Sequence, residues 1–217
     1  MAADDVVGDL NLDGSRPRMH VRSENGILLS ARKTGDPLLN LEFQYWCADS
    51  TSSDYLSVQQ SEVSVFPSGQ SAPLFRLDAK ADSHSVPATH WNIYAKRDHL
   101  VAVMRKSGRY SGSKHTKSLL KRPSGGLGKI HFPVGGWRFR PCLEDVMQML
   151  IDEFDVACEA GAREVIREKR RRWREFQLAA AVWDHPEHAA ASLREIGYMV
   201  TAPSEVRAER VDNTGAI

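Results

Sequence analysis

Three polar residues that could take part in acid–base chemistry alternate along one short segment. His90, Asn92 and Tyr94 lie two residues apart, and residues at this spacing in a β-strand project from the same face of the sheet. His131 lies in a later segment that we also expect to be a strand. If the two strands pair, the two imidazoles could act as general base and general acid on a phosphodiester. We therefore predict His90 and His131 as an acid/base pair and Asn92 and Tyr94 as residues that orient the substrate.

The alternative for these histidines is an ordinary place in a sheet with local hydrogen bonds. A metal site is not indicated, because the sequence contains no HxH or HExxH spacing. We predict chemistry that needs no metal.

A long basic segment follows the histidine-bearing strand. Residues 99–143 contain no Asp or Glu but ten Lys or Arg, and aromatic residues are interleaved among them. Basic side chains can neutralise phosphates and aromatic rings can stack on unpaired bases. The residues that we predict to contact nucleic acid are Arg105, Arg109, Lys114, Lys117, Arg138, Arg140 and Trp137. The alternative is a solvated loop whose charge balances the acidic helix after it.

The distribution of charge tells more than its total. The formal net charge is +1, but outside residues 99–143 the chain has nineteen basic and twenty-eight acidic residues. A second basic run, Arg167 to Arg174, has six basic residues in eight and lies in a predicted helix. We expect its arginines to be solvated, or to face phosphates or a protein partner.

Several other classes of protein are not indicated. The sequence has no phosphate-binding loop, dinucleotide fingerprint or GxSxG turn, so we expect no cofactor. Cys47, Cys142 and Cys158 form no CxxC pair and are interpreted as reduced thiols. The polar, acidic beginning and the absence of a long apolar run predict a cytoplasmic protein without a membrane partner.

The order of elements predicts an α+β fold, in which an antiparallel β-sheet meander is followed by about three α-helices. We expect a flexible arm at residues 1–18, a sheet domain at 19–140 with a basic loop at 105–128, a helical part at 141–200 and a disordered tail at 201–217. The chain of 217 residues fits one fair-sized domain with such appendages. The oligomeric state is left open.

Turn and cap signals set the predicted boundaries. Asn25-Gly26 predicts a hairpin, and alternating residues 39–46 predict the clearest strand, paired with residues 55–66. Further strands are expected at 73–79, 89–95 and 129–132. Amphipathic helices are expected from near Pro141 to 154 and over 162–183, and a third is expected to begin with Asp184 as its cap and to end at Gly197.

One stretch carries a family resemblance. Residues 131–146, HFPVGGWRFRPCLEDV, with the upstream PATHWNIY at 87–94, resemble uncharacterised proteins common in actinobacteria, and the match extends over residues 39–198. The resemblance implies a strand-rich fold with the same H-F-P turn before a C-L-E-D helix, and no established activity. A looser resemblance, limited to the histidine-bearing strand, the later turn and the next helix, is to small toxin components of toxin–antitoxin pairs.

Together these features predict an intracellular bacterial protein that engages RNA or another nucleic acid. Its action would be that of a metal-independent ribonuclease-like toxin or a phage-defence component. The alternative is a non-enzymatic interaction or regulatory module, similar to an antitoxin, that binds a protein through its C-terminal helices.

Overall fold

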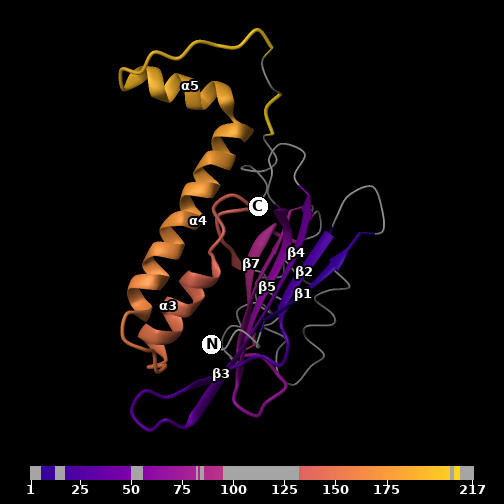
Figure 1. Cartoon of the computed structure of the whole chain (residues 1–217), viewed down its shortest axis with the longest axis vertical. Helices are drawn as coiled ribbons and strands as arrows, with labels where there is room; N and C mark the ends of the chain where they lie inside the picture. The colour runs from indigo at the N-terminus through magenta and orange to yellow at the C-terminus, as the bar shows by residue number, and fades with distance from the viewer. Residues whose placement is uncertain are drawn as a thin grey trace, which may run out of the picture.

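The chain folds as a β-sheet with helices along one of its sides. The computed structural model describes residues 6–12, 18–49, 56–81, 83, 86–94, 132–205 and 208–210. Figure 1 shows α3 (Leu143–Glu153) and α4 (Ala162–Asp184) on the same side of the sheet, and α5 (Pro186–Glu195) beyond the outer end of α4. Strands come first and helices afterwards, which confirms the predicted α+β fold.

The described residues form one antiparallel sheet of eight strands. In chain order the strands are β1 (Val6–Asn11), β2 (Arg18–Ser23), β3 (Ile27–Ser30), β4 (Pro37–Asp49), β5 (Leu56–Pro67), β6 (Phe75–Lys80), β7 (Thr89–Ile93) and β8 (Phe132–Pro133). Their order across the sheet is β1-β2-β4-β5-β6-β7-β8, and β3 pairs with β4 beside β2. The central strands therefore follow the predicted meander.

The two faces of the sheet differ in polarity because each strand alternates. On β4, Leu39, Leu41 and Phe43 join the buried core, and the registers place Val63 and Leu77 of the next strands on the same face. The core is completed from α3 and the residues after it, by Val146, Leu150 and Val156. The helical part therefore packs directly on the sheet and shares its core.

The predicted hairpin at Asn25-Gly26 is wrong. β2 and β3 do not pair with each other; both pair antiparallel with β4, so they run in the same direction along one of its edges. Gly26 makes the break between them with a φ of 75°, and a Cβ there would collide with the Asn40 side chain. The turn signal marks a break in an edge strand.

The reversal lies at the next glycine, between β3 and β4. Gly35 has a φ of 75°, and its N–H donates to the Ala31 carbonyl at 2.9 Å. The Ala31 N–H in turn donates to the Asp36 carbonyl at 2.9 Å.

Two helix starts differ from the predictions. α3 begins at Leu143 after Cys142, whose backbone N–H donates to the Asp145 carboxylate at 3.0 Å. α5 begins at Pro186 after His185, and no side chain caps it. Asp184 is instead the last residue of α4 and is only 1% exposed. Its carboxylate binds Arg138, so it is not available as a cap.

Parts of the predicted arm and tail are ordered. Residues 6–11 of the predicted arm form β1, which pairs with β2 over six positions. In the predicted tail, the Arg210 N–H donates to the Asp184 carbonyl at 2.8 Å, and a Glu209 carboxylate oxygen lies 3.7 Å from Nδ1 of His185. These segments are therefore attached to the folded part of the protein.

Several predicted site residues lie outside the described residues. They are His131, Arg105, Arg109, Lys114 and Lys117, together with the rest of the predicted loop at 105–128.

Candidate functional site

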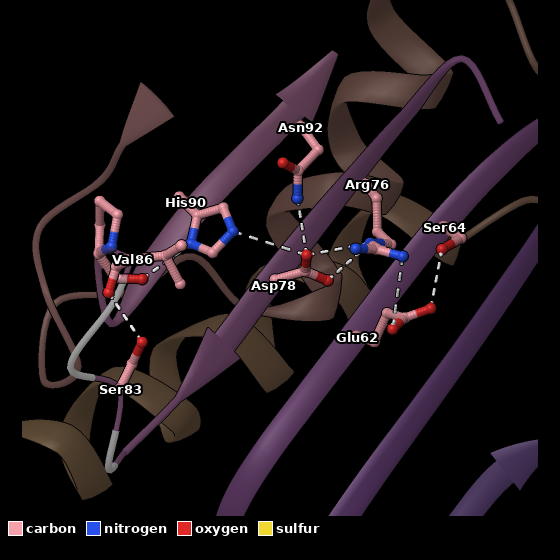
Figure 2. A network of polar contacts seen from close by, with 9 residues as sticks. Glu62, Ser64, Arg76, Asp78, Ser83, Val86, His90 and Asn92 are labelled. Carbon is pink, nitrogen blue, oxygen red and sulfur yellow. Dashed lines mark hydrogen bonds and ion pairs between the residues drawn. The ribbon is translucent and has the colours of Figure 1, made fainter. Parts of the chain in front are cut away.

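A polar cluster lies on the sheet face opposite the core. The registers place Glu62 beside Asp78, Asp78 beside His90, and Arg76 beside Asn92. Figure 2 shows these side chains pointing toward one another from β5, β6 and β7. The alternation that buries Val63, Leu77 and Trp91 in or against the core therefore gathers charged and amide groups on the other face.

Asp78 is the hub of this cluster. Its Oδ2 accepts hydrogen bonds from Asn92 Nδ2 at 2.6 Å and from Arg76 Nε at 3.0 Å, and its Oδ1 lies 2.9 Å from the same guanidinium nitrogen. Arg76 also reaches Glu62 at 3.8 Å. Burial lowers the pKa of Arg76, but the two carboxylates outweigh this effect and raise that pKa above its ordinary value. Arg76 is therefore held as a cation on the sheet.

His90 is almost fully buried between two oxygen atoms. Its Nδ1 lies 2.8 Å from the Pro87 carbonyl oxygen, and its Nε2 lies 3.6 Å from Oδ2 of Asp78. A carbonyl oxygen can only accept, so Nδ1 carries a hydrogen, and the position of Nε2 suits an ion pair when the ring is charged. In this arrangement both ring nitrogens face protein oxygens.

Asn92 has one satisfied and one unsatisfied side-chain atom. Its Nδ2 donates to Asp78, but its buried Oδ1 has no hydrogen-bond partner. The amide orientation is fixed, because the flipped form would turn an oxygen toward the Asp78 carboxylate. A buried acceptor without a donor is costly, so this atom is suited to accept from a water or a ligand.

The structure brings together part of the predicted acid–base group. His90 and Asn92 share the polar face, as the alternation predicted, because both contact Asp78. Tyr94 follows the end of β7 and lies close enough to Arg76 to influence its pKa. The pairing of β7 with β8 sets His90 opposite Pro133. His131 lies outside the described residues, so the predicted pair of imidazoles remains a prediction.

Sequence reasoning missed Glu62, Arg76 and Asp78. A signal was present, because Arg76 and Asp78 alternate with Phe75 and Leu77 in a predicted strand next to the histidine-bearing strand. Aligning the two alternations would have placed Asp78 beside His90.

Three of the predicted nucleic-acid contacts belong to a buried junction between β8 and α3. Arg140 is 7% exposed, and its guanidinium lies 3.8 Å from the ring centre of Trp137 and 5.2 Å from that of Trp173. Its Nη1 donates to the Trp137 carbonyl at 2.7 Å. Burial and the nearby charge of Arg138 lower the pKa of Arg140 to about 10. This cation is packed between aromatic rings, away from any phosphate in solution.

Arg138 is held by a buried carboxylate at the same junction. Its Nε donates to Asp184, and its Nη2 donates to the second oxygen of that carboxylate at 3.2 Å. This bidentate pair joins the segment before α3 to the end of α4. We therefore no longer assign Arg138, Arg140 and Trp137 a role in nucleic-acid binding, because their positions serve the packing of this junction.

An exposed arginine stripe runs along α4. Arg167, Arg170, Arg171, Arg174, Glu175 and Leu178 line a shallow groove of about 440 Å³. Arg171 and Arg174 keep 66% and 64% of their side chains exposed, and no ion pair holds Arg167 among the described residues. Arg170 is the anchor of the stripe, with its Nε 2.9 Å from Asp145 and its Nη2 donating to the Glu144 carbonyl at 3.1 Å.

The stripe keeps an excess of positive charge. Asp145 is shared between Arg170 and Arg174, and Glu175 pairs with Arg171 at 2.5 Å. Four guanidinium groups thus face two carboxylates. Both ion pairs of Arg171 and Arg174 are open to solvent, where such pairs are weak and an incoming anion can replace them.

The described residues hold no group of three or more His, Cys, Asp or Glu side chains arranged for a metal ion. No helix in the same part of the chain is long and apolar enough to cross a membrane.

Comparisons with known proteins give no relative. No family model matches the chain, no curated protein is similar to it, and no solved structure matches its fold. The resemblances noted in the sequence therefore stay predictions.

Proposed function

We propose that the protein binds nucleic acid and that the arginine stripe of α4 contacts the phosphates. The observation that carries this proposal is the exposed row of Arg167, Arg171 and Arg174 along a groove with too few carboxylates to neutralise it. A guanidinium matches a phosphate through paired N–H donors, which makes such a row suited to a phosphate backbone.

The arrangement along the helix supports this proposal. Arg167, Arg171 and Arg174 are separated by four and three residues, so they share one side of α4 and rise by about 6 Å and then about 4.5 Å along it. Consecutive phosphates of one strand could therefore be contacted by consecutive arginines. The side chains pay little in lost contacts, because only solvent-exposed ion pairs must be given up.

The test is binding of a labelled single-stranded RNA at several salt concentrations. Each phosphate contact on a single strand contributes about 0.7 to the slope of log K against log salt. The double variant Arg167→Gln/Arg174→Gln should lower the magnitude of this slope by about 1.4. The matched control is Lys169→Gln/Arg172→Gln, which removes the same charge from exposed positions of the same helix outside the groove.

The expected result is a loss of affinity and slope in the stripe variant and little change in the control. Equal losses in the two variants would show that only the overall charge of the helix matters. Binding that does not weaken with salt would contradict phosphate contact altogether.

A second candidate function is cleavage of the bound RNA, which the cluster of Asp78, His90 and Asn92 favours. The buried Oδ1 of Asn92 lacks a donor, and a ribose hydroxyl is a donor of the required kind. For His90 to transfer a proton, its Nε2 would have to turn from Asp78 toward the substrate. Cleavage would also support the predicted role as a toxin or phage-defence component.

Cleavage is tested with His90→Gln and His131→Gln in the presence of a metal chelator. Metal-independent acid–base catalysis predicts that the unaltered protein cuts RNA under these conditions and that both variants still bind RNA but do not cut it. RNA that stays intact with the unaltered protein would contradict this second function without affecting the first.

A further inference from the structure

The outer half of α4 is an apolar surface that the rest of the described structure leaves open. Phe176, Leu178, Val182 and Trp183 form this outer patch, and their exposed fractions range from 40% for Trp183 to 67% for Leu178. At about 100° per residue they lie within one side of the helix about 160° wide. That side is opposite Ile166, Ala180 and Asp184, the buried residues of α4.

Exposed apolar side chains continue beyond α4. Leu193, Ile196, Tyr198 and Met199 are all exposed, and α5 has no buried residue. With the outer patch, these residues expose roughly 900 Å² of apolar surface, taking about 160 to 250 Å² for each fully exposed large side chain. A standard protein interface buries about 800 Å² on each partner. The surface is thus large enough for a stable complex.

The charge of α4 changes sharply at the edge of the patch. Residues 162–175 contain seven basic and three acidic residues, whereas residues 176–183 contain no charged residue. An acidic or basic partner would find no complementary charge on the outer half. A second copy of the same uncharged surface meets no repulsion there.

The charge also selects the orientation of such a pair. Parallel helices would bring the two basic inner halves side by side, and their like charges would repel. Antiparallel helices that overlap only at their outer halves place the basic halves at opposite ends. Because the patch faces away from Ile166 and Ala180, the two protein bodies would lie on opposite sides of the helix pair.

We propose that a second copy of the chain packs on residues 176–183, with the two outer halves of α4 antiparallel. Leu178 and Val182 form the centre of this contact, with the small Ala179 between them. The arginine stripe of each copy remains exposed in this arrangement, but the proposal does not depend on nucleic-acid binding.

The first test is the molecular mass of the full chain in solution over a wide range of concentration. The proposal predicts twice the chain mass of 24.3 kDa, and a monomer with Val182→Glu, whose affinity for its copy should fall about tenfold or more. The matched control is Val165→Glu, an exposed apolar residue in the first turns of the same helix. Val165→Glu should remain a dimer.

Two outcomes would overturn the proposal. One is a monomer at every concentration of the unaltered chain, and the other is an equal effect of Val182→Glu and Val165→Glu. Circular dichroism shows whether each variant keeps its helices, and Leu178→Glu supplies a second disruption of the same contact if Val182→Glu unfolds.

The second test measures orientation with a spin label at Glu168→Cys in a Cys158→Ser background. Antiparallel pairing centred near residue 180 separates the two labelled positions by about 36 Å along the helices, at 1.5 Å per residue. A separation near the spacing of adjacent helices, about 10 Å, would reject the antiparallel arrangement.

Discussion

The arginines at the junction before α3 and those on α4 show two uses of the same side chain. Arg138 and Arg140 are satisfied by a buried carboxylate, a backbone carbonyl and two aromatic rings. Arg171 and Arg174 hold only solvent-exposed ion pairs. The difference lies in their partners, because a buried guanidinium must be satisfied inside the protein and an exposed one remains available. Basic residues in a sequence therefore mark a binding surface only where the fold leaves them without such partners.

The largest expected effect concerns the buried side of this comparison. Asp184→Ala removes the carboxylate that holds Arg138 and leaves a largely buried charge without its partner. Such a loss costs about 3 to 5 kcal/mol of unfolding free energy. The measurement is denaturation by urea with two spectroscopic probes.

The matched control for Asp184→Ala is Glu175→Ala, which removes the exposed partner of Arg171 and should cost less than about 1 kcal/mol. Similar losses in the two variants would erase the distinction between the buried and exposed arginines.

The next effect concerns how Arg140 stabilises the junction. No carboxylate pairs with Arg140 among the described residues, and its guanidinium lies between Trp137 and Trp173. Its contribution should therefore come mainly from packing. Arg140→Met should retain more stability than Arg140→Lys, and Arg140→Ala should cost about 1 to 3 kcal/mol more than Arg140→Met. A lysine variant more stable than the methionine variant in thermal denaturation would show that the charge matters more.

Thiol labelling sharpens the picture of the same junction. Burial, followed by hydrogen bonding to Asp145, raises the pKa of Cys142 to about 12, so its reactive thiolate is scarce at slightly alkaline pH. Cys158 is exposed, and Cys47 is half-buried with a pKa raised by burial. Mass spectrometry should find Cys158 labelled first, Cys47 next and Cys142 last. Early labelling of Cys142 would indicate that the junction is open.

The smallest effect concerns the exposed arginines. Glu175→Gln removes the carboxylate that competes with phosphate for Arg171, so it should raise RNA affinity about twofold to fivefold at low salt. The gain should disappear in an Arg171→Gln background, as anisotropy titrations can show. A gain that persists without Arg171 would mean that Glu175 acts on binding in another way.

Much of the fold was predictable because its patterns are local. The alternation in residues 39–46 and the helical period of residues 162–183 gave β4 and α4 nearly as observed. The break at Gly26 was misjudged because a positive φ serves an interrupted edge strand as well as a hairpin. Asp184 looked like a helix cap because only the fold brings Arg138 to it from far away in the sequence.

The site was less predictable because it depends on long-range partners. The alternation of His90 and Asn92 was readable, but their common partner Asp78 comes from the neighbouring strand. The arginines of residues 138–140 and of residues 167–174 were indistinguishable by composition. Burial alone separates them, and burial follows from the packing of α4 against the junction.

Chemical modification of arginine, with and without RNA, tests the central claim most directly. In the protein alone, phenylglyoxal should modify Arg167, Arg171 and Arg174 and spare Arg138 and Arg140, as read by mass spectrometry. Saturating single-stranded RNA should then protect the three exposed arginines. Modification of the stripe that does not change with bound RNA, or RNA protection that falls on Arg138 and Arg140, would contradict the account.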